Sequence, residues 1–167
     1  QLKNKIDYTH NVKNILDFDR QILLHYQPSF EGPPLVKGDI NQDGREDIII
    51  GGDKDKPLEV WLQNKSGDFS KKKSLDFSKN QKTVVSDLAL ADLDSDGDLD
   101  LYVANGGYHD LKDGSSLLVD QVYQNDGNGT FMKADQKNSF PNEGTAVVAI
   151  EDSNRDGSRV IFVGGSI

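Results

Sequence analysis

The chain has 167 residues and none of them is cysteine, which excludes a disulfide framework, a zinc ribbon and a thiol nucleophile. It also lacks any apolar run close to the roughly 20 residues that a helix needs to cross a bilayer. Basic side chains are in the minority, with 19 Lys and Arg against 28 Asp and Glu and a net charge of −9. Because no basic stripe is available for a phosphate backbone, we expect no nucleic-acid partner. Because no apolar run is long enough, we expect no membrane span.

The lysines gather in two short groups, Lys71–Lys73 and a second between Lys79 and Lys82, which we interpret as a solvated outer strand and a linker. Catalytic signatures are missing as well. The three histidines are His10, His25 and His109, and no Gly-x-Ser-x-Gly elbow places a serine beside one of them. We therefore expect no catalytic residue and no enzymatic activity in this chain.

The chain does contain one acidic pattern that occurs three times. The copies begin at Asp39, Asp92 and Asp152. In each copy an oxygen-bearing side chain stands at positions one, three and five, and glycine follows at position six. The first two copies add an aspartate at position nine. A hard cation such as Ca²⁺ needs six or seven oxygens, and alternate side chains around a glycine turn supply them. The pattern therefore predicts calcium loops.

The predicted ligands follow from these positions, with position seven contributing only its backbone carbonyl. They are Asp39, Asn41, Asp43, the Arg45 carbonyl and Asp47 in the first loop; Asp92, Asp94, Asp96, the Asp98 carbonyl and Asp100 in the second; and Asp152, Asn154, Asp156 and the Ser158 carbonyl in a weaker third. In the third loop Val160 replaces the acid at position nine, and Arg155 and Arg159 add positive charge. We expect two bound Ca²⁺ ions and leave a third open.

Two other interpretations of these carboxylates are available: Asx-rich turns without metal and the paired acids of a glycosidase. Metal-free turns do not explain why Asp47 and Asp100 recur beside an apolar run, where an unpaired carboxylate is costly. The regular spacing around a glycine favours metal coordination over acid catalysis. An EF-hand is excluded because position twelve is Ile50, Val103 or Val163 rather than glutamate.

Apolar runs flank each loop on both sides and predict strands rather than helices. The runs before the loops are 35–36, 88–91 and 146–150, and those after them are 48–52, 101–107 and 160–165. Two further segments, 58–69 and 120–131, each combine a strand, a polar glycine turn and a phenylalanine, which is the pattern of a hairpin. One repeat is then a four-stranded antiparallel sheet. The loops begin 53 and 60 residues apart, close to the period of β-propeller blades.

These residues also carry a family resemblance. The loops followed by Ile50-Gly51-Gly52 or Val163-Gly164-Gly165, with Tyr123-Gln-Asn-Asp-Gly-Asn-Gly-Thr-Phe131 behind, resemble the FG-GAP or VCBS repeats of integrin-α-like β-propellers. The opening, with Leu16-Asp-Phe-Asp-Arg-Gln-Ile-Leu-Leu24, resembles large surface proteins of Bacteroidota that carry VCBS repeats and an ASPIC/UnbV domain. The resemblance implies an all-β propeller fold, but it names no ligand.

The chain divides into four predicted parts. An amino-terminal extension (1–34) could complete a blade, two blades follow (35–87 and 88–144), and residues 145–167 start a third. A closed propeller takes about 4–8 blades, and a third blade that stops after its second strand cannot close a ring. We therefore expect either a piece of a longer chain or identical copies that complete one another.

The sequence favours a calcium-stabilised, non-enzymatic module of a surface or secreted protein that binds a protein or glycan through loops on one propeller face. Millimolar calcium outside the cell fills even modest sites, which favours an extracellular, cell-surface or periplasmic location. The alternative is a domain or accessory subunit of an extracellular polysaccharide-acting enzyme, which needs titratable groups converging in a pocket away from the metal loops. The insert from Tyr108 to Val119 is either a partner contact or a mobile connection.

Overall fold

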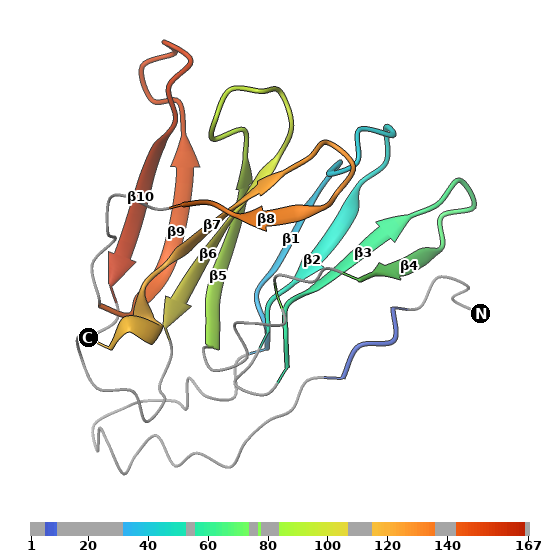
Figure 1. Ribbon diagram of the computed structural model, residues 1–167, viewed down its shortest axis with the longest axis horizontal. Helices are drawn as coiled ribbons and strands as arrows, with labels where there is room; N and C mark the ends of the chain where they lie inside the picture. Colours follow the sequence, from blue (N-terminus) through green and yellow to red (C-terminus); the bar gives the residue numbers. More distant parts are fainter. Residues whose placement is uncertain are drawn as a thin grey trace.

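The computed structural model describes residues 6–9, 32–52, 56–73, 77, 84–106, 115–135 and 143–165. Within these ranges the chain forms three antiparallel layers (Figure 1). Blade 1 contains β1 (Leu35–Gly38), β2 (Asp47–Ile50), β3 (Glu59–Gln63) and β4 (Phe69–Lys72). Blade 2 contains β5 (Val84–Ala91), β6 (Asp100–Gly106), β7 (Gln121–Asn125) and β8 (Phe131–Lys133). The third layer pairs β9 (Thr145–Glu151) with β10 (Val160–Gly165), and a short 3₁₀-helix, η4 (Ser116–Leu118), precedes β7.

The strands of each blade pair in chain order, and the three layers share one register. Val36 pairs with Ile49 in blade 1, Ala89 with Tyr102 in blade 2, and Ala149 with Phe162 in the third layer. The predicted fold class is confirmed: the protein is all-β, with four-stranded antiparallel sheets and an acidic loop between the first two strands of each layer. This is the arrangement of β-propeller blades.

Blade 2 is covered on both faces because successive residues of a strand point to opposite sides of the sheet. On β6, Leu101 and Val103 belong to a core shared with blade 1, whereas Tyr102 and Ala104 belong to a second core shared with the third layer. Phe77 extends the first core, and its ring lies 4.9 Å from that of Tyr123, centroid to centroid. The stacking of layers therefore explains why β6 is buried along its whole length.

A buried carboxylate joins blade 2 to the third layer. Asp120, which is 2% exposed, accepts hydrogen bonds from the hydroxyls of Tyr102 and Thr145, both 2.7 Å, and from the backbone N–H of Asn105 at 2.8 Å. Burial and the bond to Asp120 raise the pKa of Tyr102 well above its ordinary value. Asp87 adds a second link, because its Oδ2 accepts from the N–H of Val148 at 2.8 Å. Polar contacts therefore hold β9 against blade 2 in addition to apolar packing.

Strand β5 begins earlier than the apolar run 88–91 indicated. It starts at Val84, so the proposed boundary between residues 87 and 88 falls inside this strand. The β-branched pair Val84 and Val85 extends the strand, and the register with β6 shifts at an irregularity between Val85 and Asp87. Ser86 stands at this irregularity, and its hydroxyl lies within hydrogen-bond distance of the carbonyls of Ala104 and Thr145.

Several predicted features lie mainly or wholly outside the described residues. They are most of the extension 1–34, the three histidines His10, His25 and His109, the group between Lys79 and Lys82, and most of the insert from Tyr108 to Val119. The other lysine group is described in full. Lys71 forms an ion pair with buried Glu59 at 2.7 Å, and Lys72 donates to the carbonyl of Asn128. In the described part of the chain, no helix has the length and apolar character of a transmembrane span.

Candidate metal centre

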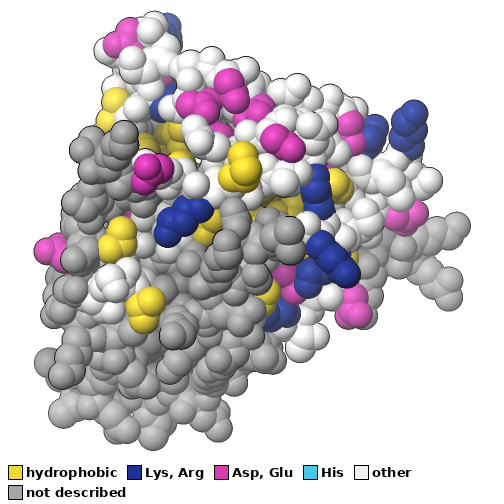
Figure 2. All heavy atoms as spheres, in the orientation of Figure 1, with side chains coloured by type: hydrophobic (Ala, Val, Ile, Leu, Met, Phe, Trp, Pro, Cys, Tyr) yellow, Lys and Arg dark blue, Asp and Glu magenta, His cyan; other side chains and the backbone are white. Residues whose placement is uncertain are grey.

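The three acidic loops, 39–46, 92–99 and 152–159, lie at one end of the layers, at the top of Figure 1. They lie together because each connects the first two strands of a layer and the layers stack side by side. Figure 2 shows acidic side chains gathered along the same end of the molecule. We call this end the acidic rim.

Each loop bends at the same two positions. The glycine at position six has a positive φ in every copy, at 82° for Gly44, 94° for Gly97 and 90° for Gly157, as a turn that closes a cage requires. Position four also has a positive φ, although it carries a side chain in each loop: Gln42, Ser95 and Arg155. Such a conformation costs on the order of 1 kcal/mol or more, so the loop shape is imposed by its surroundings.

The second loop brings three predicted ligands together. One carboxylate oxygen from each of Asp92, Asp94 and Asp100 lies within 4.8 Å of the others. Oδ1 of Asp92 and Oδ1 of Asp98 are buried and have no hydrogen-bond partner. A buried carboxylate oxygen without a partner is costly, and a cation among these groups would satisfy it. The donor set is all oxygen, which suits Ca²⁺.

The carboxylates at position nine accept hydrogen bonds that the spacing did not indicate. Asp100 accepts the N–H of Leu93 at 2.9 Å and the N–H of Asn125 at 3.0 Å. Asp47 repeats the arrangement with the N–H groups of Ile40 at 3.3 Å and Gln63 at 2.8 Å. Each carboxylate thus ties the start of a loop to the third strand of its blade, while burial raises the pKa of both.

The first loop is closed by bonds among its own residues. Asp39 accepts the N–H of Asp43 at 3.0 Å and that of Gly44 at 2.8 Å. Asn41 donates its amide to Oδ2 of Asp43 at 3.0 Å, and the guanidinium of Arg45 pairs with the same carboxylate. The first loop has a neutral asparagine at position three and a positively charged arginine at position seven, where the second loop has aspartates. The net negative charge of the first loop is therefore lower than that of the second.

The third loop shows the same internal bonds on a more exposed site. Asp152 accepts from the N–H groups of Asp156 and Gly157, and Asn154 donates to Asp156 at 2.7 Å. A hydrogen bond from the N–H of Ser158 lowers the pKa of Asp156. Because Val160 stands at position nine, this loop has no carboxylate like Asp47 or Asp100 to tie it to a third strand.

Two residues of the candidate site were not indicated by the sequence patterns. Asp98 was expected to offer only its carbonyl, but its side chain is 6% exposed and has the unpartnered Oδ1. Asn125 was assigned to a hairpin turn, yet its amide donates to the carbonyls of Ile40 at 2.8 Å and Leu99 at 3.2 Å. Asn125 therefore links the acidic loops of two neighbouring blades. The acidic residue at position seven was a sequence signal for Asp98. No local pattern indicates the role of Asn125, because its contact with Ile40 spans 85 residues.

A family comparison identifies the region that holds the first two loops. Residues 39–103 match the family model of the FG-GAP-like repeat. The match begins at the first residue of the first loop and ends within β6, so it supports the FG-GAP prediction for this part of the chain. FG-GAP-like repeats are generally non-catalytic modules. No curated protein matches the chain.

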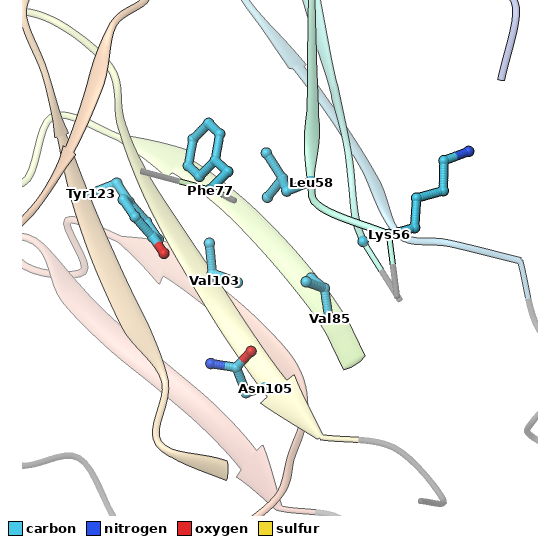
Figure 3. A pocket seen from close by; sticks show the side chains of 8 residues that line it. Lys56, Leu58, Phe77, Val85, Val103, Asn105 and Tyr123 are labelled. Atoms are coloured by element: carbon cyan, nitrogen blue, oxygen red, sulfur yellow. The ribbon is translucent and has the colours of Figure 1, made fainter. Parts of the chain in front are cut away.

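A pocket between the two blades lies away from the acidic rim. It is lined mainly by Leu58, Phe77, Val85, Val103 and Tyr123, with Gly52, Lys56 and Asn105 at its edges. Figure 3 shows the ammonium of Lys56 pointing away from the other lining side chains. The lining includes no carboxylate, histidine or serine, and its titratable side chains are those of Lys56 and Tyr123.

Asp98 predicts an unusual pH dependence of the metal-free protein. Burial, followed by the charges of Asp96 and Asp100, raises the pKa of the Asp98 carboxyl from 3.8 to about 6. The folded state therefore binds a proton more readily than the unfolded chain, and stability falls as the pH rises through about 6. Between pH 5 and pH 7 we expect a loss of about 1 kcal/mol, or about 3 °C in Tm, in excess chelator.

The variant Asp98→Asn isolates this group, because it keeps the size of the side chain and cannot ionise. Thermal melts of the chelated wild type and variant at pH 5, 6 and 7 are the measurement. The Tm of the variant should change less with pH. A wild-type Tm that rises between pH 5 and pH 7 would contradict the assignment.

Proposed function

We propose that this chain is a calcium-stabilised, non-enzymatic β-propeller repeat module of a surface or secreted protein. The observation that carries the proposal is the second loop, where carboxylate oxygens of Asp92, Asp94 and Asp100 converge and Oδ1 of Asp92 is buried without a hydrogen-bond partner. In the same loop, Oδ1 of Asp98 is also buried without one. Aspartate occupies five of the nine positions of this loop, and no lysine or arginine of the described residues forms an ion pair with them.

The second loop supplies carboxylate and carbonyl oxygens for the proposed ion. Asp92, Asp94 and Asp100 would ligate it through their carboxylates, and the predicted ligands Asp96 and the Asp98 carbonyl lie in the same turn. Bound Ca²⁺ would supply positive charge that offsets the negative charge of these clustered aspartates. Because the unfolded chain has no preformed cage, the free energy of binding adds to the stability of the fold.

We propose that the other two loops bind more weakly. In the first loop a metal must displace the amide of Asn41 and the guanidinium of Arg45 from Asp43. In the third loop the position-nine carboxylate is absent. The predicted ligands Asp39, Asn41, Asp43, Asp47 and the Arg45 carbonyl therefore form a second, weaker site, and Asp152, Asn154, Asp156 and the Ser158 carbonyl form at most a third.

The setting of the module is proposed from the repeat type. FG-GAP repeats typically occur in extracellular or surface proteins, where millimolar calcium saturates sites of modest affinity. The resemblance to VCBS-repeat proteins of Bacteroidota agrees with this setting. A protein or glycan partner is proposed to contact the loops, since loops on a rigid scaffold commonly carry recognition, and further blades or other copies would complete the propeller.

Calorimetric titration tests the metal assignment. Chelated and desalted protein is titrated with CaCl₂ at pH 7.5, beside the variants Asp94→Asn and Asp156→Asn. We expect the tightest binding event to weaken at least about tenfold in Asp94→Asn, because a charged ligand is lost. The same exchange in the third loop should leave that event unchanged. Equal binding curves for the wild type and Asp94→Asn would refute the second loop as the main site.

A further inference from the structure

A carboxamide from outside the second loop contacts one of its predicted ligands. Gln124 lies in β7, and its Nε2 donates a hydrogen bond to Oδ2 of Asp94 at 2.8 Å. Asp94 stands at position three of the second loop, 30 residues earlier in the chain. The donor is neutral, so the contact orients the carboxylate without reducing its negative charge. The third strand of blade 2 therefore holds a residue of the candidate cation site.

Position three makes one hydrogen bond in the same way in all three loops. Oδ1 of Asn41, Asp94 and Asn154 accepts the N–H of the residue two positions further along, at 3.3 Å in each case. The other atom of the side chain behaves differently. Asn41 and Asn154 donate their own amides to the carboxylate at position five, at 3.0 and 2.7 Å. Asp94 has no N–H to donate, so the second loop keeps a charged side chain at position three and receives its carboxamide from Gln124.

The strand register explains why blade 1 lacks this contact. Tyr123 and Trp61 each pair with the tenth residue counted from the first aspartate of their loop. The residues that follow them, Gln124 and Leu62, are therefore equivalent. Leucine has no donor, and Leu62 packs against the first core instead. The third layer has two strands in the described residues, so among those residues the second loop alone receives a carboxamide from the third strand of its blade.

We propose that Gln124 is a positioning residue that holds Asp94 in the orientation that ligates Ca²⁺. The inference rests on the calcium site proposed above. One oxygen of Asp94 lies within 4.8 Å of oxygens of Asp92 and Asp100. A carboxylate oxygen has two lone pairs, so Asp94 can accept the amide of Gln124 and still face a cation. Residues behind the ligands orient them in this way, and losing such a residue typically weakens metal binding about 10- to 100-fold.

Calcium titration of Gln124→Leu is the first test, because leucine is the residue that blade 1 has at this position. Chelated and desalted protein is titrated with CaCl₂ in a calorimeter. The Kd of the tightest binding event should rise about tenfold. The Tm in excess EGTA should stay close to that of the wild type, because the bond is exposed to solvent. Gln124→Ala repeats the test without adding apolar surface. Met132→Leu is the matched control, because Met132 pairs with Gln124 across the hairpin and is 61% exposed; its Kd should equal the wild-type value.

A double-mutant cycle separates an effect through Asp94 from a general effect on the strand. An asparagine at position three can donate its own amide to position five, as Asn41 and Asn154 do, so Asp94→Asn removes the need for Gln124. Gln124→Leu should therefore weaken calcium binding about tenfold in the wild type and less than about twofold in Asp94→Asn. A residue that only stabilises β7 would weaken binding by the same factor in both backgrounds.

Three results overturn the inference. If Asp94→Asn weakens calcium binding but Gln124→Leu does not, the positioning role is refuted and the proposed calcium site stands. If Gln124→Leu weakens binding equally in both backgrounds, or lowers the Tm in EGTA as much as in calcium, Gln124 acts on the fold rather than on Asp94. If Asp94→Asn binds calcium as the wild type does, the calcium site of the second loop is refuted and the inference fails with it.

Discussion

Removing calcium is expected to lower the Tm of this protein by about 10 °C. A ligand present at 100 to 1,000 times its Kd stabilises the folded state by roughly 3–4 kcal/mol, and for a chain of this size each kcal/mol shifts Tm by about 2–4 °C. We expect the effect to arise in the second loop, where the proposed cation would satisfy the unpartnered Oδ1 of Asp92.

Differential scanning fluorimetry in 2 mM CaCl₂ and in excess EGTA measures this difference. Asp94→Asn should melt at a lower temperature than the wild type in calcium and should respond less to EGTA. Asp156→Asn in the third loop should retain most of the wild-type response, because that loop lacks a position-nine carboxylate. Identical melting curves with and without EGTA would contradict a structural role for calcium.

Replacing Asp120 by alanine is expected to destabilise the protein by about 3–5 kcal/mol. The change leaves the hydroxyls of Tyr102 and Thr145 and the N–H of Asn105 without their acceptor, and buried polar groups that lose a charged partner cost this much. The loss falls on the junction between blade 2 and β9, so the third layer should detach from blade 2 more readily. Urea denaturation in excess CaCl₂ gives the free energy of unfolding.

A double-mutant cycle separates the lost bonds from other effects of Asp120→Ala. Thr145→Val removes one of the three donors, so the double variant should lose less stability than the sum of the two single variants. Asp135→Ala is a control for removing an acidic side chain, because Asp135 is exposed just after β8. A loss below about 1 kcal/mol for Asp120→Ala would show that the junction does not depend on this carboxylate.

The strands and loops were predictable because local patterns encode them. The spacing from Asp92 to Asp100 and the apolar run that begins at Leu101 fixed the loop, the strand and their order. Hairpin chemistry also placed the turns. The structure makes Asn64 and Asp126 equivalent, because each accepts the N–H groups of the residues two and four positions further along the chain.

The remaining features depend on contacts between layers, which local patterns do not report. The position-nine carboxylates bond to a strand 16 or 25 residues further along the chain. The burial of Asp98 results from the approach of the turn between β7 and β8, where a Cβ added at Gly127 would lie 3.4 Å from Oδ2 of Asp98. Sequence spacing therefore identified the ligand candidates but could not rank the three loops.

The bridge made by Asn125 has a consequence for how the acidic rim carries mechanical load. Its amide contacts the carbonyls of Ile40 and Leu99, so one side chain is shared by the loops of both blades. A partner that pulls on either loop transmits tension to the other blade through this amide and through the Asp100 carboxylate bonded to its backbone. The two blades should consequently resist extension together and rupture in a single event.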